Sequence, residues 1–219
     1  MSPSPELDGD TPAGATVRTR AKARRRACIL AASAKLFAEH GFHHVSNEDI
    51  GAAAGVSGPA VYRHFASKQA MLAASLVEAS TNLLAGGQEV DARPMPAAAR
   101  LEALIAFHVQ FALQDPALIV IQDREMANLS VDDRRTVRRL QRGYVSLWVK
   151  TLQELAPDRD AGELTLRAHA VFGLINSTPH ALRAGGLLEP EEATIHLARC
   201  ALAEMAWAAL ASAWTPTPK

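Results

Sequence analysis

The sequence predicts an all-α fold, in which a small N-terminal three-helix domain precedes a larger helical bundle. Of the 219 residues, 48% are hydrophobic and 5% aromatic, and this alanine-rich composition favours helices around a packed core. Apolar residues recur at helical spacing, whereas no segment alternates with the period of a strand. Pairs such as Gly86-Gly87, Asp115-Pro116 and Gly185-Gly186 separate the periodic segments, as expected at helix ends.

The N-terminus divides into a polar tail and a basic run. Residues 1–17 are rich in Pro, Gly, Ser and Thr, which predicts a disordered tail. The next residues carry six basic side chains: Arg18, Arg20, Lys22, Arg24, Arg25 and Arg26. They form either the solvated start of the first helix or an arm that contacts phosphates or a minor groove. Because positive charge is unfavourable at a helix N-terminus, we favour the arm.

The first two helices are defined by their apolar spacing and their caps. The first follows the basic run, buries Ile29 and Phe37 at helical spacing, and stops at Gly41. The second begins at Ser46, where Asp49 completes a short capping box. Gly55 supplies the positive φ angle that ends the second helix.

A third helix follows this glycine turn at once. Ser57 caps it, Pro59 falls where a missing N–H costs nothing, and Val61, Tyr62 and Phe65 are expected to anchor it. The residues left facing outward are Gly58, Pro59, Ala60 and Arg63. Two short helices joined this way predict a helix-turn-helix, whose second helix enters the major groove of DNA. The alternative is an ordinary corner between two helices of a bundle.

The order of these motifs resembles the DNA-binding domain of the TetR family of transcriptional regulators. The similarity covers about 50 of the 219 residues, from Ile-Leu-Ala-Ala and Leu-Phe-Ala-Glu-His-Gly-Phe through Ala-Gly-Val-Ser to Tyr-Arg-His-Phe and Ser-Lys. The resemblance implies an all-helical homodimer that binds an operator and is released from it by a small molecule. Two positions differ from the common pattern: Gly51 stands where Ala is usual, and Ala60 where Thr or Ser often contacts DNA.

The resemblance also implies which residues contact DNA. Four positions match family positions on the phosphate backbone: Ser46, Tyr62, His64 and Lys68. Gly58, Pro59, Ala60 and Arg63 occupy the exposed side of the recognition helix, and Arg63 is the best candidate for reading bases. For Tyr62, packing is an equal alternative, and His64 could instead cap the helix end.

The charge distribution agrees with a nucleic-acid partner at the N-terminal end. The formal net charge is zero, yet residues 18–68 hold nine Lys and Arg against three Asp and Glu, as phosphate attraction requires. Cys28 and Cys200 are expected to be small buried hydrophobes in a reducing cytosol. The sequence shows no signal peptide and no membrane span, so we expect a cytoplasmic protein.

The remainder of the chain is predicted to be a helical body. We expect helices at about 68–88, 95–114, 116–128, 130–156, 160–184 and 189–213. The predicted domains are therefore a tail at 1–17, a helix-turn-helix domain at 18–66 and a ligand-binding and dimerisation domain at 67–214. The helix at 68–88 would join the last two domains and connect ligand to DNA.

Aromatic and polar residues on the body helices suggest a pocket for a small hydrophobic effector. The candidates are Phe107, His108, Phe111, Met126, Tyr144, Trp148, Phe172 and Asn176. Residues of these types are also common in a plain core, so that alternative stays open. His108 and Asn176 are stronger evidence for a pocket than the other candidates, because polar groups on apolar helix faces need hydrogen-bond partners.

A basic stripe follows the 130–156 helix at helical spacing. It consists of Arg134, Arg135, Arg138, Arg139 and Arg142. A solvated helix face is its default interpretation. Some TetR-like regulators sense acyl-CoA esters, so the resemblance implies a sharper hypothesis, in which the stripe holds the phosphates of coenzyme A. Long-chain acyl-CoA is then the first effector to test, and a planar hydrophobic drug or metabolite the second.

The last helix is apolar around most of its circumference and so needs cover on both sides. Together with the preceding helix it is expected to form the dimer interface, the alternative being a central helix of a monomer. Rival functions are a helical-bundle enzyme and a DNA-independent binding protein. No di-carboxylate metal motif, nucleophile elbow or phosphate loop is present, so we expect no enzyme, no cofactor and no metal.

Overall fold

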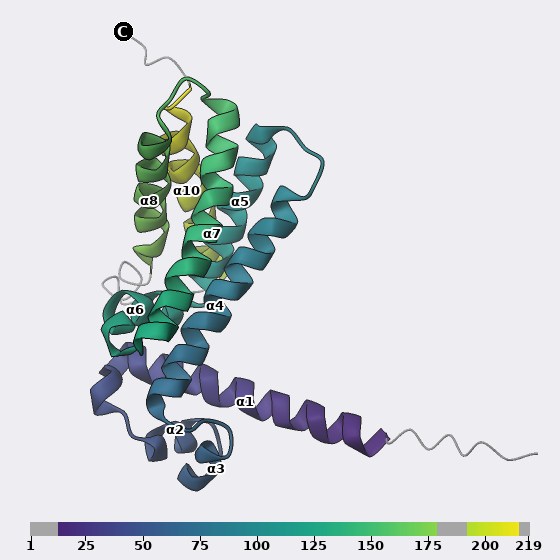
Figure 1. Cartoon of the computed structure of the whole chain (residues 1–219), viewed down its shortest axis with the longest axis vertical. Coiled ribbons are helices and arrows are strands. Elements are labelled where there is room, and N and C mark those ends of the chain that lie inside the picture. Colours follow the sequence, from purple (N-terminus) through teal and green to yellow (C-terminus); the bar gives the residue numbers. More distant parts are fainter. Residues whose placement is uncertain (1–12, 179–191, 215–219) are drawn as a thin grey trace, which may run out of the picture.

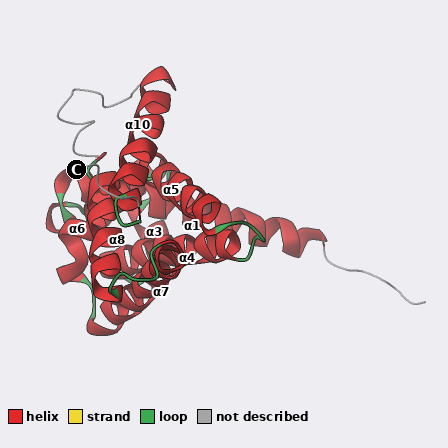
Figure 2. Ribbon diagram, turned by 90° about the horizontal axis from the view of Figure 1, so that it is seen from above, coloured by secondary structure: helices red, strands yellow, loops and turns green. Residues whose placement is uncertain are grey.

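The computed structural model describes residues 13–178 and 192–214, and throughout these ranges the regular structure is helical (Figures 1 and 2). The predicted all-α fold is confirmed. Three helices form the N-terminal part: α1 (Ala13–His40), α2 (Asn47–Ala53) and α3 (Gly58–Tyr62). A short 3-10 turn, η1 (Phe42–His44), connects α1 with α2.

The body contains six further helices among the described residues. They are α4 (Lys68–Asp91), α5 (Ala97–Gln114), α6 (Pro116–Glu125), α7 (Val131–Leu155), α8 (Ala161–Asn176) and α10 (Glu192–Ala211), with the 3-10 turn η2 (Met126–Asn128) after α6. The end of the predicted 160–184 helix and the start of the predicted 189–213 helix lie outside the described ranges. Figure 1 shows α4 rising from the helix-turn-helix along the length of the body.

Helix α1 is much longer than predicted. Residues 13–17, assigned to the disordered tail, form its start, and residues 1–12 lie outside the described residues. The basic run at 18–26 is therefore helical and not an extended arm. Alanines between the basic residues explain this, because Ala, Arg and Lys are all strong helix formers.

The glycine pair Gly86-Gly87 was predicted to end a helix, and this is wrong. Helix α4 continues through both residues to Asp91. A Cβ at Gly86 would clash with the Phe107 ring of α5, and one at Gly87 would lie 2.8 Å from Tyr144 of α7. These glycines therefore allow α5 and α7 to pack closely against α4.

The buried residues form two hydrophobic cores. The lower core joins α1, α2, α3 and the first turns of α4 to Ile121 of α6 and Val137 of α7. The upper core fills the space between α4, α5, α7, α8 and α10. Because the lower core includes α6 and the start of α7, the DNA-binding unit continues in space beyond residue 66.

No single described helix is long and apolar enough to cross a membrane. Only α5 and α6 together reach that length and composition, as a pair bent by 85°.

Candidate DNA-binding and effector sites

The helix-turn-helix has the predicted cap at α2, whereas Ser57 stands at the N-cap position of α3 without the predicted side-chain hydrogen bond. The Ser46 hydroxyl accepts the Asp49 N–H at 3.0 Å, and the Asp49 carboxylate accepts the Ser46 N–H at 2.8 Å, completing the capping box. The Ser46 hydroxyl also donates to the Asp49 carboxylate. This hydrogen bond lowers the pKa of Asp49 most, and the one from the Ser46 N–H lowers it further. Gly55 has a φ of 67°, the positive angle expected after α2.

Gly51 is required where α2 and α3 meet. A Cβ on this residue would lie 2.9 Å from the Val56 carbonyl oxygen and 3.0 Å from the Gly58 nitrogen. Both neighbours are backbone atoms, so they cannot move aside without opening the turn. In this chain a glycine at position 51 therefore allows the close approach of α2 and α3.

The exposed side of α3 differs in part from the prediction. Pro59 and Arg63 are exposed, and Gly58 is half-buried against the Glu48 side chain. Ala60 was predicted to face outward but is only 5% exposed. It neighbours the buried Val61, and a step of about 100° along a helix leaves both residues on the same covered half.

Tyr62 is not part of the anchor of α3. Its side chain is 56% exposed, whereas Val61 and Phe65 are buried in the lower core. An exposed aromatic with a hydroxyl is free to contact a phosphate, which favours the DNA-contact interpretation of Tyr62 over packing.

The basic residues of α1 gather near the end of α3. Loss of solvation lowers the pKa of His64, and the positive charges of Lys22, Arg25, Arg63 and Arg26 lower it further. These cations therefore form one basic surface with the recognition helix, suited to phosphates. A helix about 10–12 Å wide cannot enter a minor groove about 6 Å wide, which argues against the minor-groove role considered for this run.

Lys68 has a structural role that its sequence position did not reveal. Its ammonium group donates to the carbonyl oxygens of Phe42 and Val45 at 2.9 and 2.6 Å, and lies 4.9 Å from the centre of the Phe42 ring. Two of its three N–H donors are thus occupied in fixing the turn between α1 and α2. A phosphate contact by the third donor stays a prediction.

A cavity of about 460 Å³ lies inside the body, a size typical of small-molecule sites. Helices α4 to α8 supply its walls, and we call it the body cavity. Five of the eight predicted pocket residues line it: His108, Phe111, Tyr144, Phe172 and Asn176. The sequence prediction missed other lining residues, among them Ser80, Gln122, Gln141 and His169. Of these four residues, only Ser80 could have been predicted from the sequence, because it is a polar residue at an apolar position of its helix.

Three predicted pocket residues lie elsewhere. Trp148 is fully buried behind Phe172, 4.9 Å between ring centroids, and so supports the wall without lining it. Phe107 faces a different cavity, between α1 and the body. Met126 lies in η2 and packs on the lower core. Its helical spacing was right, but α6 ends before it and turns it toward the DNA-binding domain.

The body cavity contains polar atoms without partners. His108 Nε2 lies 3.2 Å from Asn176 Oδ1, and burial lowers the pKa of His108 to about 4, so its ring is neutral. Burial raises the pKa of Tyr144. His108 Nδ1, the Tyr144 hydroxyl and the Ser80 hydroxyl make no hydrogen bond to any described residue. An apolar ligand with one polar group would satisfy such atoms.

A basic groove leads away from the cavity along α7. Gln141, Val145 and His169 line both the body cavity and a shallow outer hollow, and Arg138 and Arg142 continue from that hollow into a second one beside Arg134 and Arg135. Neither Arg138 nor Arg142 forms an ion pair with a residue that the structure describes. Arg139 lines neither hollow, so the predicted stripe divides into groove residues and a solvated residue.

Helix α6 connects the body cavity to the DNA-binding domain. Ile119 and Gln122 of this helix line the cavity. At its end, Arg124 Nη1 donates to the Ala38 carbonyl at 3.2 Å, and Glu125, only 6% exposed, accepts the Phe42 N–H at 3.3 Å. A displacement of α6 at the cavity therefore acts on the turn that Lys68 also holds.

Two family models match the chain, one in each of its two parts. Residues 29–75 match the family described as bacterial regulatory proteins, tetR family, and residues 94–205 match the tetracyclin repressor-like C-terminal domain. The chain belongs to the TetR family of transcriptional regulators. The second match includes the cavity walls that α5 to α8 supply, whereas the α4 wall, with Ser80 and Leu83, lies between the two matches.

Individual relatives carry the same fold. The chain is 29% identical over 136 residues to the HTH-type transcriptional repressor KstR2 of Rhodococcus jostii (strain RHA1), covering 62% of this chain and 67% of that protein. A TetR-family regulator from Bordetella parapertussis 12822 matches with a TM-score of 0.73 at 22% identity, over 88% and 98% of the two chains. The structure of FadR from Bacillus subtilis in complex with stearoyl-CoA matches with a TM-score of 0.64 at 20% identity. The match covers 85% of this chain and 97% of that chain.

Two expectations about α10 and the cysteines need correction. The last two helices are expected to meet a second subunit, and the sequence favours Leu202 and Ala206 of α10 as interface residues, but both are buried in the chain's own upper core, as are Ala168 and Ile175 of α8. The exposed apolar residues of these helices are instead Leu166, Leu197 and Met205. Cys28 and Cys200, predicted to be buried, are both exposed, because each faces away from the core side of its helix.

Proposed function

We propose that this chain is a dimeric repressor that leaves its operator when an acyl-CoA binds the body cavity. The observation that carries the proposal is the continuity of an apolar cavity with a basic groove. An acyl chain is apolar and coenzyme A carries phosphates, so one molecule has the chemistry of both parts. The solved relative in complex with stearoyl-CoA supports this choice.

The polar atoms in the cavity also suit a thioester. The Tyr144 and Ser80 hydroxyls lie in the cavity wall and make no hydrogen bond to a residue in the described ranges. Either could donate to the thioester carbonyl, while the chain beyond it packs on Phe111 and Phe172. A free fatty acid lacks the phosphates that the basic groove is proposed to hold, so it should bind more weakly than the CoA ester.

Operator binding in this proposal requires two linked recognition helices. Half-sites one helical turn apart lie about 34–36 Å from each other, so a dimer is needed. Leu166 and Leu197 are each 69% exposed, and we propose that they contact the second subunit. Leu197→Glu should give monomers in sedimentation and abolish operator binding. An unchanged dimer in both Leu197→Glu and Leu166→Glu would refute this interface.

Calorimetry with palmitoyl-CoA and with palmitate, alongside a gel shift on the chain's own upstream DNA, tests the effector. We expect palmitoyl-CoA to bind more tightly than palmitate and to release DNA, and a tenfold loss of operator affinity corresponds to about 1.4 kcal/mol of coupling. Two single substitutions, Arg138→Ala and Arg142→Ala, should each weaken CoA-ester binding. The neighbouring Arg139→Ala is the matched control. Equal losses in all three, or binding of a planar hydrophobic compound only, would contradict the acyl-CoA assignment.

Base reading is proposed for Arg63, the exposed residue that ends α3. Arg63→Ala should cost about 1–3 kcal/mol of operator affinity and relax base preference. If the variant kept full affinity and selectivity, the helical basic run of α1 would have to supply recognition.

A further inference from the structure

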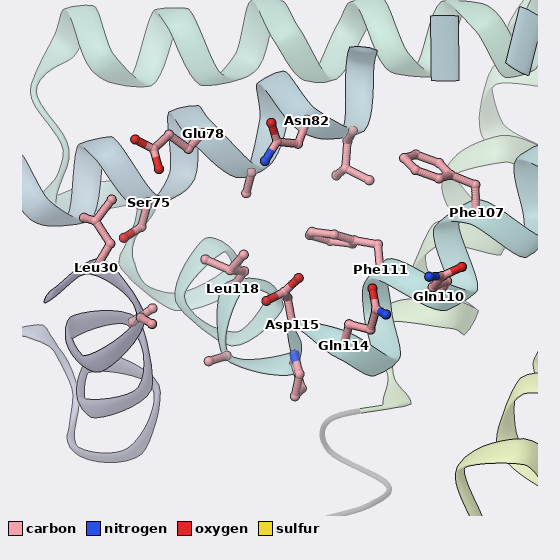
Figure 3. Close-up of a pocket in the computed structure, with 16 residues that line it drawn as sticks. Leu30, Ser75, Glu78, Asn82, Phe107, Gln110, Phe111, Gln114, Asp115 and Leu118 are labelled. Atoms are coloured by element: carbon pink, nitrogen blue, oxygen red, sulfur yellow. The ribbon is translucent and has the colours of Figure 1, made fainter. Parts of the chain in front are cut away.

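A second cavity, of about 470 Å³, lies where the DNA-binding domain meets the body (Figure 3). We call it the junction cavity. Its walls come from α1, α4, α5 and the start of α6, and Leu83 and Phe111 separate it from the body cavity, because they line both. Leu30 and Ala34 of α1 contribute one wall. A ligand in this cavity would therefore contact both domains at once.

The charged side chains that line the junction cavity are acidic, and one of them, Glu78, is paired with Arg26 outside the lining. Among its 16 lining residues, all of them described, Glu78 and Asp115 are acidic and none is basic. Asp115 occupies the N-cap position of α6, yet its side chain makes no capping hydrogen bond. Figure 3 shows its carboxylate turned toward the interior, opposite the Asn82 amide. Partial burial raises the pKa of Asp115, although the residue keeps an exposed side that solvent can reach.

A buried hydroxyl and two aromatic rings complete the wall. Ser75 is only 5% exposed, and its Oγ makes no hydrogen bond to any residue that the structure describes. Such a group is costly to leave unpaired. Phe107 and Phe111 line the cavity on the other side, and the faces of aromatic rings attract cations. Carboxylates, a free hydroxyl and aromatic rings together select a positively charged hydrogen-bond donor.

We propose that the junction cavity binds a primary ammonium compound with an apolar tail, as a second effector site separate from the body cavity. The ammonium N–H groups would donate to Asp115 and Glu78, and the tail would pack on Leu30, Leu118 and Phe111. An ammonium ion is compact and carries three donors, so it can pair with acceptors on two different helices.

Binding at this site would act directly on the DNA-binding domain. Glu78 of α4 already forms an ion pair with Arg26 of α1, and the Arg26 guanidinium lies 5.0 Å from the centre of the Phe65 ring. An ammonium ion at Glu78 competes with Arg26 for the same carboxylate. The competition weakens a link between α1 and α4, so the ligand is expected to lower operator affinity.

Calorimetry on the full-length protein with hexylammonium, hexanol and hexanoate, three probes of equal chain length, tests the site. Hexylammonium should bind at least about tenfold more tightly than hexanol, because hydrogen bonds between charged partners are the stronger ones. Hexanoate should not bind measurably. Equal affinity for hexylammonium and hexanol would overturn the proposal.

Two matched aspartates identify which cavity the ammonium ion occupies. Asp115 lines only the junction cavity, and Asp123 lines only the body cavity. Asp115→Asn should abolish the preference for hexylammonium, and Asp123→Asn should leave it intact. The opposite result would place the ligand in the body cavity and overturn the proposal, while palmitoyl-CoA binding reports separately on the proposed function. Unchanged operator affinity at saturating hexylammonium would overturn the coupling through Arg26.

Discussion

The helix-turn-helix and the body cavity are built by different physical rules. The helix-turn-helix uses the contiguous segment 46–65, and its shape follows from neighbours in sequence, such as the capping box of Ser46 and Asp49. The cavity collects residues between Ser80 and Ser177 from five helices. Its decisive contact, His108 with Asn176, joins residues 68 positions apart. Local hydrogen-bond rules specify the first site, whereas only packing specifies the second.

Helix α6 contacts both regions. One part of it lines the body cavity, and its C-terminal end holds the turn after α1 through Arg124 and Glu125. The shape of the helix-turn-helix depends on local contacts, and that of the cavity depends on packing. Substitutions in each part, and in α6 between them, can test this contrast.

The largest expected effect is a pH dependence that originates in the body cavity. The pKa of His108 is about 4 in the folded protein and 6.5 in the unfolded chain. Between these values the unfolded chain binds a proton that the folded protein excludes, so the free energy of unfolding falls as pH falls. The loss should total about 3 kcal/mol from pH 6.5 to pH 4.

Urea unfolding between pH 7 and pH 4.5 measures this dependence. His108→Leu should remove it, whereas His43→Gln, at an exposed histidine, should keep it. The same pH slope in His108→Leu and the wild type would show that His108 is not buried in its neutral form.

Lys68→Met should lower stability by about 1.5–3 kcal/mol, because it removes hydrogen bonds from a charged donor to two backbone carbonyls. Thermal unfolding measures the loss, and Lys35→Met, at an exposed lysine of α1, is the control. The salt dependence of operator binding then separates two roles. If the slope of log operator affinity against log salt concentration is unchanged, Lys68 only positions the turn between α1 and α2. If the slope falls by about one in magnitude, Lys68 makes the phosphate contact that the resemblance implies.

Gly51→Ala should destabilise the protein by about 1–3 kcal/mol, because the new Cβ meets backbone atoms across the α2–α3 turn. Operator binding should fall with it. Gly173→Ala is the matched control, since a Cβ there meets nothing within 4 Å and alanine is the better helix former by up to about 1 kcal/mol. Stabilisation by both substitutions would mean that the helix-turn-helix tolerates a wider spacing.

Glu125→Gln should have the smallest effect, about 1 kcal/mol on the coupling between effector and operator. It weakens the acceptor for the Phe42 N–H without changing the volume of the side chain. The measurement compares operator affinity with and without palmitoyl-CoA, with Glu102→Gln, at an exposed residue of α5, as control. If the coupling were unchanged, the signal would have to pass through α4 instead.

Much of the fold and of the DNA-binding site followed from the sequence, for reasons visible in particular residues. Ser46, Asp49 and Gly55 act on atoms within a few positions, so their caps and the turn were predictable. Helical spacing likewise predicted the body helices. Spacing gives the face on which a side chain lies but not what covers that face, and so Ala60, Met126 and Cys28 were misplaced.

The sequence by itself determined the all-α fold, the helix-turn-helix and its family, because these depend on local periodicity, caps and turn conformations. Only the tertiary structure decided which polar atoms share the body cavity, that Lys68 fixes a turn, and that a second, acidic cavity lies at the domain junction. The same holds for Gly86 and Gly87, whose role depends on rings of α5 and α7. The physical reason is that packing brings together groups many residues apart, and no local rule encodes their distances.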